Sequence, residues 1–192
     1  MRLLLARHGQ SRWQIAGDAA GSDAPLTPLG ELQAHRLGVY LQRDGDGLRI
    51  ARVVASDLQR ARRTAEIVAS YLALPVELAP GLQEFEGWPV GWAPKPAAMW
   101  DPRPDAPLAA PYLTFRERVV EVVRRAIAQE GTPLIVAHGG TISAFLRFLT
   151  GCDTPRFAIA NAALQIVSWK DDAWMFEALN LQDYLPLPLR SI

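Results

Sequence analysis

Short apolar runs alternate along the chain with longer stretches in which apolar residues recur every three or four positions. The short runs predict buried strands over residues 3–6, 51–55, 75–78 and 134–137. The longer stretches predict amphipathic helices that begin at Pro28, after Asp57, at Thr114 and after Thr141. Because strand and helix alternate, we predict an α/β protein, a three-layer α/β/α sandwich with a mostly parallel central sheet.

Polar residues mark the expected helix boundaries. Thr27 is expected to cap the first helix, with Pro28 at its first position and the run 44–47 ending it. Ser56-Asp57 and Thr141 are expected to cap two later helices. Each cap would satisfy a backbone N–H that has no partner within its helix.

Four further segments lie outside this alternation. The polar residues after Ser11, up to Pro25, are typical of a loop, and residues 163–169 and 173–178 predict a hairpin. The tail 185–189, in which leucine and proline alternate, is expected to be extended. From Pro80 to Pro111 the chain is predicted to be irregular, and its Trp/Pro-rich part at about 85–111 is expected to cover a site.

Composition narrows the class of protein. The 192 residues suit a single domain, 1–192, and the twenty basic and twenty acidic side chains give no field that would attract nucleic acid or an anionic membrane. The single cysteine excludes an internal disulfide. The N-terminal apolar run is too short for a signal peptide or a membrane span. We therefore expect a cytoplasmic protein, with no nucleic acid and no membrane as partners.

Two of the predicted strands end in the same kind of residue. His8 follows the strand 3–6 after Arg7, and His138 follows the strand 134–137. Ligands bind at the carboxyl ends of strands in open α/β sheets. Arg60 lies near a helix start, where the helix dipole disfavours a cation, and this indicates a binding role. Two histidines and two arginines at one sheet edge would hold a compact dianion such as phosphate. The third histidine, His35, is expected to be a surface or packing residue.

Five motifs, in order along the chain, resemble those of the histidine phosphatase superfamily, in the branch with cofactor-dependent phosphoglycerate mutases and bacterial phosphatases. They are Leu5–Ser11, Leu26–Gly30, Ser56–Ala61 followed by Thr64-Ala65, Leu82–Glu84, and Val136–Gly140. The resemblance spans Leu3 to about Asn161. It implies a phosphoglycerate mutase-like fold and a phosphoryl-transfer site that uses no metal and no cofactor.

The resemblance also implies a role for each site residue. His8 is the implied nucleophile, and Glu84 the implied proton donor to the leaving alcohol and then the base for water. Metals usually neutralise the charge in phosphoryl transfer; here two guanidiniums and an imidazolium would substitute. The attacking nitrogen of the nucleophile must be unprotonated, which requires an acceptor for its other nitrogen, expected to be a backbone carbonyl near Gly9. The implied substrate-binding residues are Arg7, Gln14, Arg60, His138 and Gly139.

Some assignments stay open at this stage. Glu86 is the alternative proton donor to Glu84, and Arg60 has Glu66 or Asp57 as alternative partners. A metal site formed by His8, His138 and Glu84 is a further alternative, which the nearby arginines would oppose.

Three functions compete. The first is a metal-independent phosphatase acting on a small phosphorylated metabolite, and the second is a cofactor-dependent phosphoglycerate mutase. The segment 86–111 favours the first, because it is short and carries only Lys95 and Arg103 as basic residues. The third is a weakly active or non-catalytic phosphate-binding relative, suggested by Gln14 at a position where the family has asparagine. The apolar hairpin near the C-terminus makes a homodimer an expectation as well.

Overall fold

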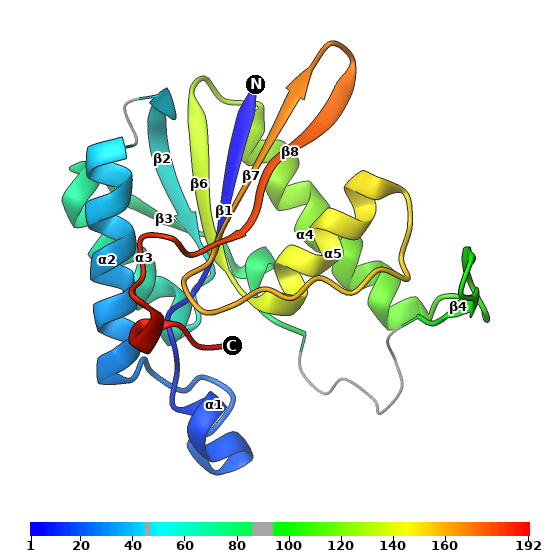
Figure 1. The fold of residues 1–192 in the computed structure, drawn as a ribbon, viewed down its shortest axis with the longest axis horizontal. Coiled ribbons are helices and arrows are strands. Elements are labelled where there is room, and N and C mark those ends of the chain that lie inside the picture. The colour runs from blue at the N-terminus through cyan, green and yellow to red at the C-terminus, as the bar shows by residue number, and fades with distance from the viewer. Residues whose placement is uncertain (45–46, 86–93) are drawn as a thin grey trace.

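The computed structural model describes residues 1–44, 47–85 and 94–192. Its centre is a six-stranded sheet in the order β3-β2-β6-β1-β7-β8 (Figure 1). The strands of this sheet are β1 (Arg2–Arg7), β2 (Ile50–Ala55), β3 (Val76–Leu78), β6 (Thr132–Ala137), β7 (Leu164–Lys170) and β8 (Ala173–Leu181). The first four in spatial order are parallel, whereas β7 pairs antiparallel with β1 and β8 pairs antiparallel with β7. The predicted α/β sandwich with a mainly parallel sheet is confirmed.

Helices cover both faces of the sheet. Helices α2 and α3 lie on one face and α4 and α5 on the other (Figure 1), while the short α1 projects beyond the sheet. Their bounds are α1 (Trp13–Ala16), α2 (Pro28–Asp44), α3 (Gln59–Leu72), α4 (Ala110–Ile127) and α5 (Gly139–Thr150). None of the helices in the described part of the chain is long and apolar enough to cross a membrane.

Strand β1 is buried on both sides, as its uninterrupted apolar run requires. Leu3 and Leu5 belong to the core under α4 and α5, together with Phe115. Leu4 and Ala6 belong to the core under α2 and α3. Because alternate side chains of one strand enter two separate cores, the end of β1 is held in a fixed position.

The sheet brings four chain segments to one edge. Strand β1 lies beside β6 with Arg7 opposite Ala137, so that the residues after each strand are neighbours. Strand β6 also pairs with β2, which leads into α3, and β2 pairs with β3, which leads to residues 80–84. The carboxyl ends of these four parallel strands therefore meet where a ligand site is expected.

Several local predictions are wrong. The segment predicted as one loop from Ser11 to Pro25 contains α1 and a 3₁₀ helix over Gly17–Ala20. The tail expected to be extended contains a 3₁₀ turn over Leu187–Leu189. Proline is tolerated there because the first N–H groups of a helical turn need no internal partner.

The predicted caps have mixed outcomes. Thr27 caps α2, since its Oγ1 accepts a hydrogen bond of 3.0 Å from the Gly30 amide. The N-cap of α3 is Leu58 rather than Ser56-Asp57. Thr141 lies inside α5 and donates its hydroxyl proton to the carbonyl of Leu82 instead. Both misses come from tertiary hydrogen bonds that a local sequence rule cannot see.

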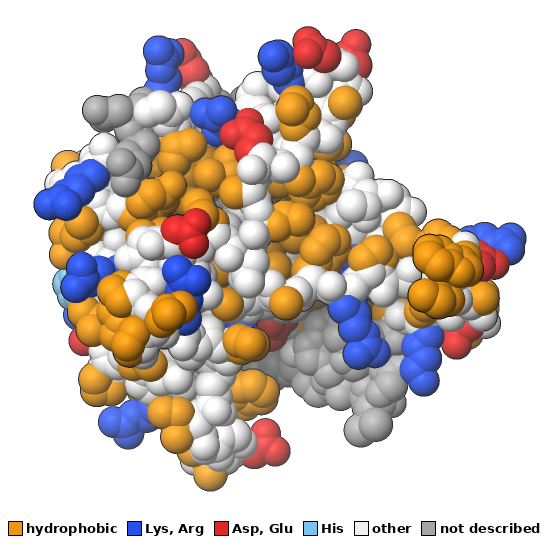
Figure 2. All heavy atoms as spheres, viewed as in Figure 1, with side chains coloured by type: hydrophobic (Ala, Val, Ile, Leu, Met, Phe, Trp, Pro, Cys, Tyr) orange, Lys and Arg blue, Asp and Glu red, His pale blue; other side chains and the backbone are white. Residues whose placement is uncertain are grey.

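The segment predicted to be irregular is partly ordered. It contains a two-stranded hairpin of β4 (Pro96–Ala98) and β5 (Asp101–Pro104), and α4 begins at Ala110 rather than Thr114. The hairpin stands away from the main sheet, and hydrophobic side chains gather on it (Figures 1 and 2). At its turn, Met99 and Trp100 are 84% and 88% exposed.

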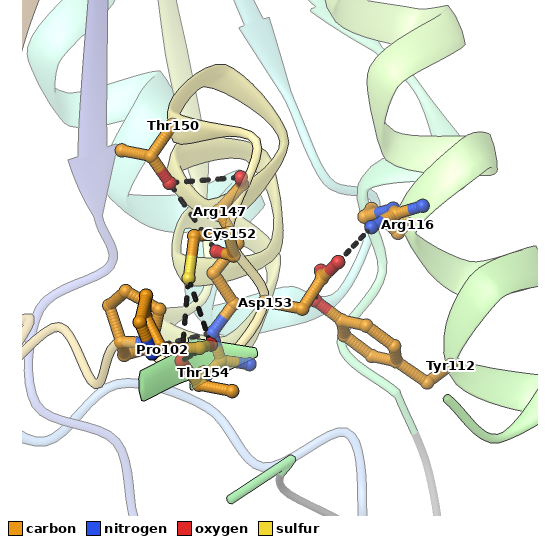
Figure 3. Close-up of polar contacts among 9 residues, drawn as sticks. Pro102, Tyr112, Arg116, Arg147, Thr150, Cys152, Asp153 and Thr154 are labelled. Atoms are coloured by element: carbon orange, nitrogen blue, oxygen red, sulfur yellow. Dashed lines mark hydrogen bonds and ion pairs between the residues drawn. The ribbon is translucent and has the colours of Figure 1, made fainter. Parts of the chain in front are cut away.

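A polar cluster fastens the loop after α5 to its neighbours (Figure 3). Asp153 accepts hydrogen bonds from Tyr112, at 2.6 Å, and from Arg116, both on α4. The adjacent Thr154 donates its hydroxyl to the carbonyl of Pro102 on β5 at 2.7 Å. These bonds join α4 and the hairpin to the loop that leads to β7. Phe157, a residue of this loop, lines the cavity described below.

Candidate active site

His8 stands at the carboxyl end of β1 and is 4% exposed. Its Nδ1 lies 2.6 Å from the carbonyl of Gly9, which can only accept, so Nδ1 carries the proton. Its Nε2 accepts a hydrogen bond of 3.3 Å from Arg60 Nε and therefore holds a lone pair. Burial, with the charges of Arg7 and Arg60, keeps the pKa of His8 well below its usual value. The expected backbone acceptor near Gly9 is thus Gly9 itself.

Gly9 has to be glycine for steric reasons. A Cβ on this residue would lie 2.3 Å from the carbonyl oxygen of Gly30, a backbone atom that cannot move aside cheaply. This close approach of the β1 end to the start of α2 fixes the turn that presents the His8 ring.

His138 meets His8 from the neighbouring strand. The two ring centroids are 5.1 Å apart, and His138 is 1% exposed. Its Nε2 lies 2.9 Å from Ser56 Oγ, which already accepts a hydrogen bond from the Leu58 amide. Ser56 can donate its hydroxyl proton to His138 Nε2, and in the tautomer that accepts it the neutral ring carries its proton on Nδ1.

The charge of His138 differs from the sequence-based expectation of an imidazolium. Burial lowers its pKa well below the usual value, and the charges of His8, Arg60 and Arg7 act in the same direction. These effects favour the neutral form of the His138 ring.

Two buried nitrogens at this edge lack a hydrogen-bond partner among the described residues: Arg7 Nε and His138 Nδ1. Buried polar groups are almost always satisfied, so this pair marks a place where a ligand oxygen could be bound. Another nitrogen of Arg7 bonds to the carbonyl of Ile159, and Arg60 Nη1 donates to the carbonyl of Ser22 at 2.7 Å. These backbone bonds hold both guanidiniums in place beside His8.

Glu84 approaches from the segment that follows β3. Its carboxylate accepts hydrogen bonds from the amide of Gly140, at 2.9 Å, and from that of Phe85, at 3.2 Å. Burial raises the pKa of Glu84, while these two amides and the arginines Arg60 and Arg7 act against that rise. A carboxyl group with a raised pKa can donate a proton closer to neutral pH than an exposed one.

These residues line a cavity of about 840 Å³. The lining contains Arg7, His8, Arg60, Glu84, Gln14 and Gly139, whereas His138 lies buried beside it. Gln14 uses its amide within the protein: Oε1 accepts from the Ser11 amide at 2.7 Å, and Nε2 donates to Asn161 Oδ1 at 2.6 Å and to the carbonyl of Ile192. Gly139 lies against Arg7, whose Nε would be 3.6 Å from a Cβ on that glycine.

The structure also shows the partners of other residues that the sequence singled out. Arg60 bonds to His8 and Ser22, while Glu66 pairs with Arg62 and Arg63. His35 is an exposed residue that bonds to the hydroxyl of Tyr71. Glu86 lies outside the described residues. Across the described ranges, no group of three or more His, Cys, Asp or Glu side chains is arranged to hold a metal ion.

Sequence reasoning missed part of the lining. Trp13 was placed in a loop, and Phe157 and Ile159 carried no motif, yet all three line the cavity. Ser56 was expected to cap a helix but holds His138 instead. Trp13, four positions after Gly9, is the one local signal for this side of the site.

Comparisons with known proteins agree with this arrangement. The family model of the histidine phosphatase superfamily (branch 1) matches residues 3–182. A Bacillus subtilis phosphatase named PhoE is 29% identical over 197 residues, covering 94% of this chain and 95% of that protein. A Yersinia enterocolitica protein named as a probable phosphoglycerate mutase is 27% identical over 193 residues, covering 91% and 88%.

Among solved structures, a mycobacterial glucosyl-3-phosphoglycerate phosphatase, in a complex with VO₃, has a similar fold. Its TM-score is 0.74 at 23% identity, and the match covers 94% of this chain and 99% of that one. At this identity the likeness establishes the fold.

Proposed function

The chain belongs to the histidine phosphatase superfamily, and from that premise we propose that it is a metal-independent phosphatase that hydrolyses a small phosphomonoester through a phosphohistidine on His8. The observation that carries the proposal is the unprotonated Nε2 of His8, a residue that lines the cavity with Arg7 and Arg60. Nearby, Arg7 Nε and His138 Nδ1 are buried without a hydrogen-bond partner among the described residues.

In the first step, the lone pair of His8 Nε2 forms a bond to phosphorus while the bond from phosphorus to the leaving oxygen breaks. Glu84, whose pKa burial raises, is the group that gives a proton to that oxygen. Arg7, Arg60 and His138 donate to the phosphoryl oxygens throughout. Two fixed guanidiniums supply the positive charge that phosphoryl transfer requires.

In the second step, water attacks the phosphohistidine. Glu84, now a carboxylate, takes a proton from the water as its oxygen bonds to phosphorus. The bond between phosphorus and His8 Nε2 breaks, and inorganic phosphate leaves. Nε2 regains its lone pair because Nδ1 has kept its proton on the Gly9 carbonyl throughout.

Phosphoglycerate mutase is the second candidate, because one relative carries that name. The two reactions share the phosphohistidine and differ in what accepts its phosphoryl group: water in a phosphatase, a second hydroxyl of phosphoglycerate in a mutase. The expected homodimer and cytoplasmic location stay predictions.

The test is phosphate release from p-nitrophenyl phosphate in the presence of EDTA, with the wild-type protein and His8→Ala. We expect the wild type to turn over under chelation and His8→Ala to lose turnover. Activity that EDTA abolishes would contradict the metal-free proposal, and an active His8→Ala would contradict the assigned nucleophile. In parallel, 2-phosphoglycerate formed from 3-phosphoglycerate and 2,3-bisphosphoglycerate would establish the mutase instead.

A further inference from the structure

The cavity is much larger than a phosphoryl group requires. Beyond the phosphate-binding groups, the lining includes a set of apolar residues: Trp13, Leu58, Phe85, Phe157, Ala158 and Ile159. The uncharged polar side chains that also line it are Ser11, Gln14, Ser22 and Ser143. Trp13 is 48% exposed despite its position on this wall. Cavities with an apolar wall and a few polar groups at one end are typical of sites that hold an organic molecule by its charged end.

The wall is held in a fixed position. Trp13 is the first residue of α1, and the amide side chain of Gln14 beside it bonds to Ser11 and to the fully buried Asn161. The amide of Arg12 bonds to the carbonyl of Pro25 at 2.9 Å. The Trp13 ring therefore extends from a backbone fastened on both sides, which lowers the entropic cost of binding a ligand against it.

Few charged side chains line the cavity in the described part of the chain. Arg7 and Arg60 are the basic lining residues among those the structure describes, and the proposed reaction uses both on the phosphoryl group. Residues 86–93, outside the described ranges, contain no lysine or arginine in their sequence. The remaining charge of the described lining, apart from Glu84, is Asp18, an acid. A carboxylate or second phosphate on the leaving group would lose its hydration without gaining a cation.

We infer that the leaving group of the substrate is uncharged and aromatic or otherwise apolar, and that Trp13 forms the wall against which it packs. This inference rests on the proposed phosphatase function and narrows its substrate class. The cavity combines the two arginines that bind the phosphoryl group with apolar residues, and its described lining has no further basic residue. Esters with a charged leaving group, such as phosphoglycerate, should therefore bind poorly. Trp13 acts on specificity through contact with the leaving group.

The test compares two aryl esters of similar size, phenyl phosphate and 4-carboxyphenyl phosphate. The carboxyphenolate is the better leaving group, so intrinsic reactivity favours the charged ester. We expect the reverse order of kcat/KM, with phenyl phosphate ahead by roughly tenfold or more because the carboxylate finds no cation. An equal or faster reaction of the charged ester would overturn the inference.

Variants of Trp13 distinguish its contact with the leaving group from a general loss of activity. Trp13→Ala is expected to raise KM for 2-naphthyl phosphate by about tenfold, since the aromatic contact is lost, and to change KM for methyl phosphate little. Trp13→Phe should restore most of the loss. Trp100→Ala is the matched control, because Trp100 is 88% exposed on the β4–β5 hairpin and is not among the described residues that line the cavity. Equal effects of Trp13→Ala and Trp100→Ala would overturn the role of Trp13.

The two proposals fail in different ways. If the wild type hydrolyses none of these esters, the phosphatase function fails and the inference fails with it. If it hydrolyses them without preference for the uncharged leaving group, the phosphatase function stands and only the substrate class is wrong.

Discussion

The amide of Gly140 donates a hydrogen bond of 2.9 Å to Glu84 Oε2, and a Cβ on Gly140 would lie only 2.4 Å from Glu84 Oε1. The absence of a side chain at the start of α5 is thus what allows the carboxyl group to reach its place. The contact joins two segments 56 positions apart in the chain. It also makes the position of the proton donor testable without altering the donor itself.

Gly140→Ala is expected to displace the Glu84 carboxyl group and to slow hydrolysis of an alkyl phosphate by roughly tenfold or more. The fold should be unharmed, because alanine is the better helix former by about 1 kcal/mol. Steady-state kinetics together with thermal unfolding would check both parts. In the background of Glu84→Gln the same substitution should have little further effect, and a full independent effect there would contradict the assignment.

Glu84→Gln should affect substrates according to their leaving groups. A poor alkoxide leaving group needs the proton and should be slowed about 100-fold or more, whereas p-nitrophenolate needs little protonation and should be slowed less. The basic limb of the kcat/KM profile, where Glu84 loses its proton, should disappear. Equal slowing of both ester classes, or an unchanged basic limb, would remove Glu84 from the role of acid.

Ser56→Ala is expected to lower kcat/KM by about tenfold, the cost of one hydrogen bond to a buried ring. Without the Ser56 hydroxyl, His138 loses the hydrogen bond that holds its Nε2 and, in the proposed mechanism, keeps the ring proton on Nδ1. Ser56→Thr retains the hydroxyl and serves as the control. Kinetics indistinguishable among the three proteins would show that Ser56 does not orient His138.

Thermal stability is expected to fall as the pH drops below about 6.5. Burial lowers the pKa values of His8 and His138 in the folded state, so the unfolded chain takes up protons that the folded protein excludes. The two histidines contribute their full share to the free energy of unfolding at pH values above their pKa in the unfolded chain. This contribution is lost as the pH falls toward their lower pKa values in the folded protein. Each unit of pKa difference corresponds to about 1.4 kcal/mol.

Glu84 has the opposite effect on the pH dependence of stability. Its folded pKa is raised, so its contribution is present below the unfolded pKa and is lost as the pH rises through the folded value. Melting temperatures measured from about pH 7.5 to about pH 5 should therefore fall less steeply in His138→Gln and more steeply in Glu84→Gln. His35→Gln, at an exposed histidine, is the control. Identical slopes in all four proteins would contradict the buried neutral state of His138.

The sequence predicted the parts of the site that lie directly on strands. An apolar run followed by histidine places His8 and His138 at strand ends, and parallel pairing of β1 with β6 then brings the rings within 5.1 Å. Arg60 was singled out because the helix dipole disfavours a cation at a helix start, and the structure buries it in the first turn of α3. Local pattern and global topology agree at these positions.

Other parts depend on contacts that no local pattern encodes. Serine is a residue type that commonly caps helices, and only the packing of β2 beside β6 directs the Ser56 hydroxyl to His138. The hairpin that carries Trp100 forms within a stretch rich in proline, where local propensity predicts no strands. The Leu187–Leu189 turn lies in the tail that bonds to Gln33 through the Leu189 carbonyl. Each was missed because a tertiary partner outweighed local preference.

The central claim is that His8 Nε2 carries the phosphoryl group between substrate and water. Its most direct test is rapid acid-free quenching of the enzyme during turnover of a phosphomonoester, followed by peptide mapping of the phosphorylated residue. We predict an acid-labile phosphohistidine at His8 that is absent from His8→Ala and unchanged in His35→Ala. Phosphate found on another residue, or label that survives in His8→Ala, would contradict the account.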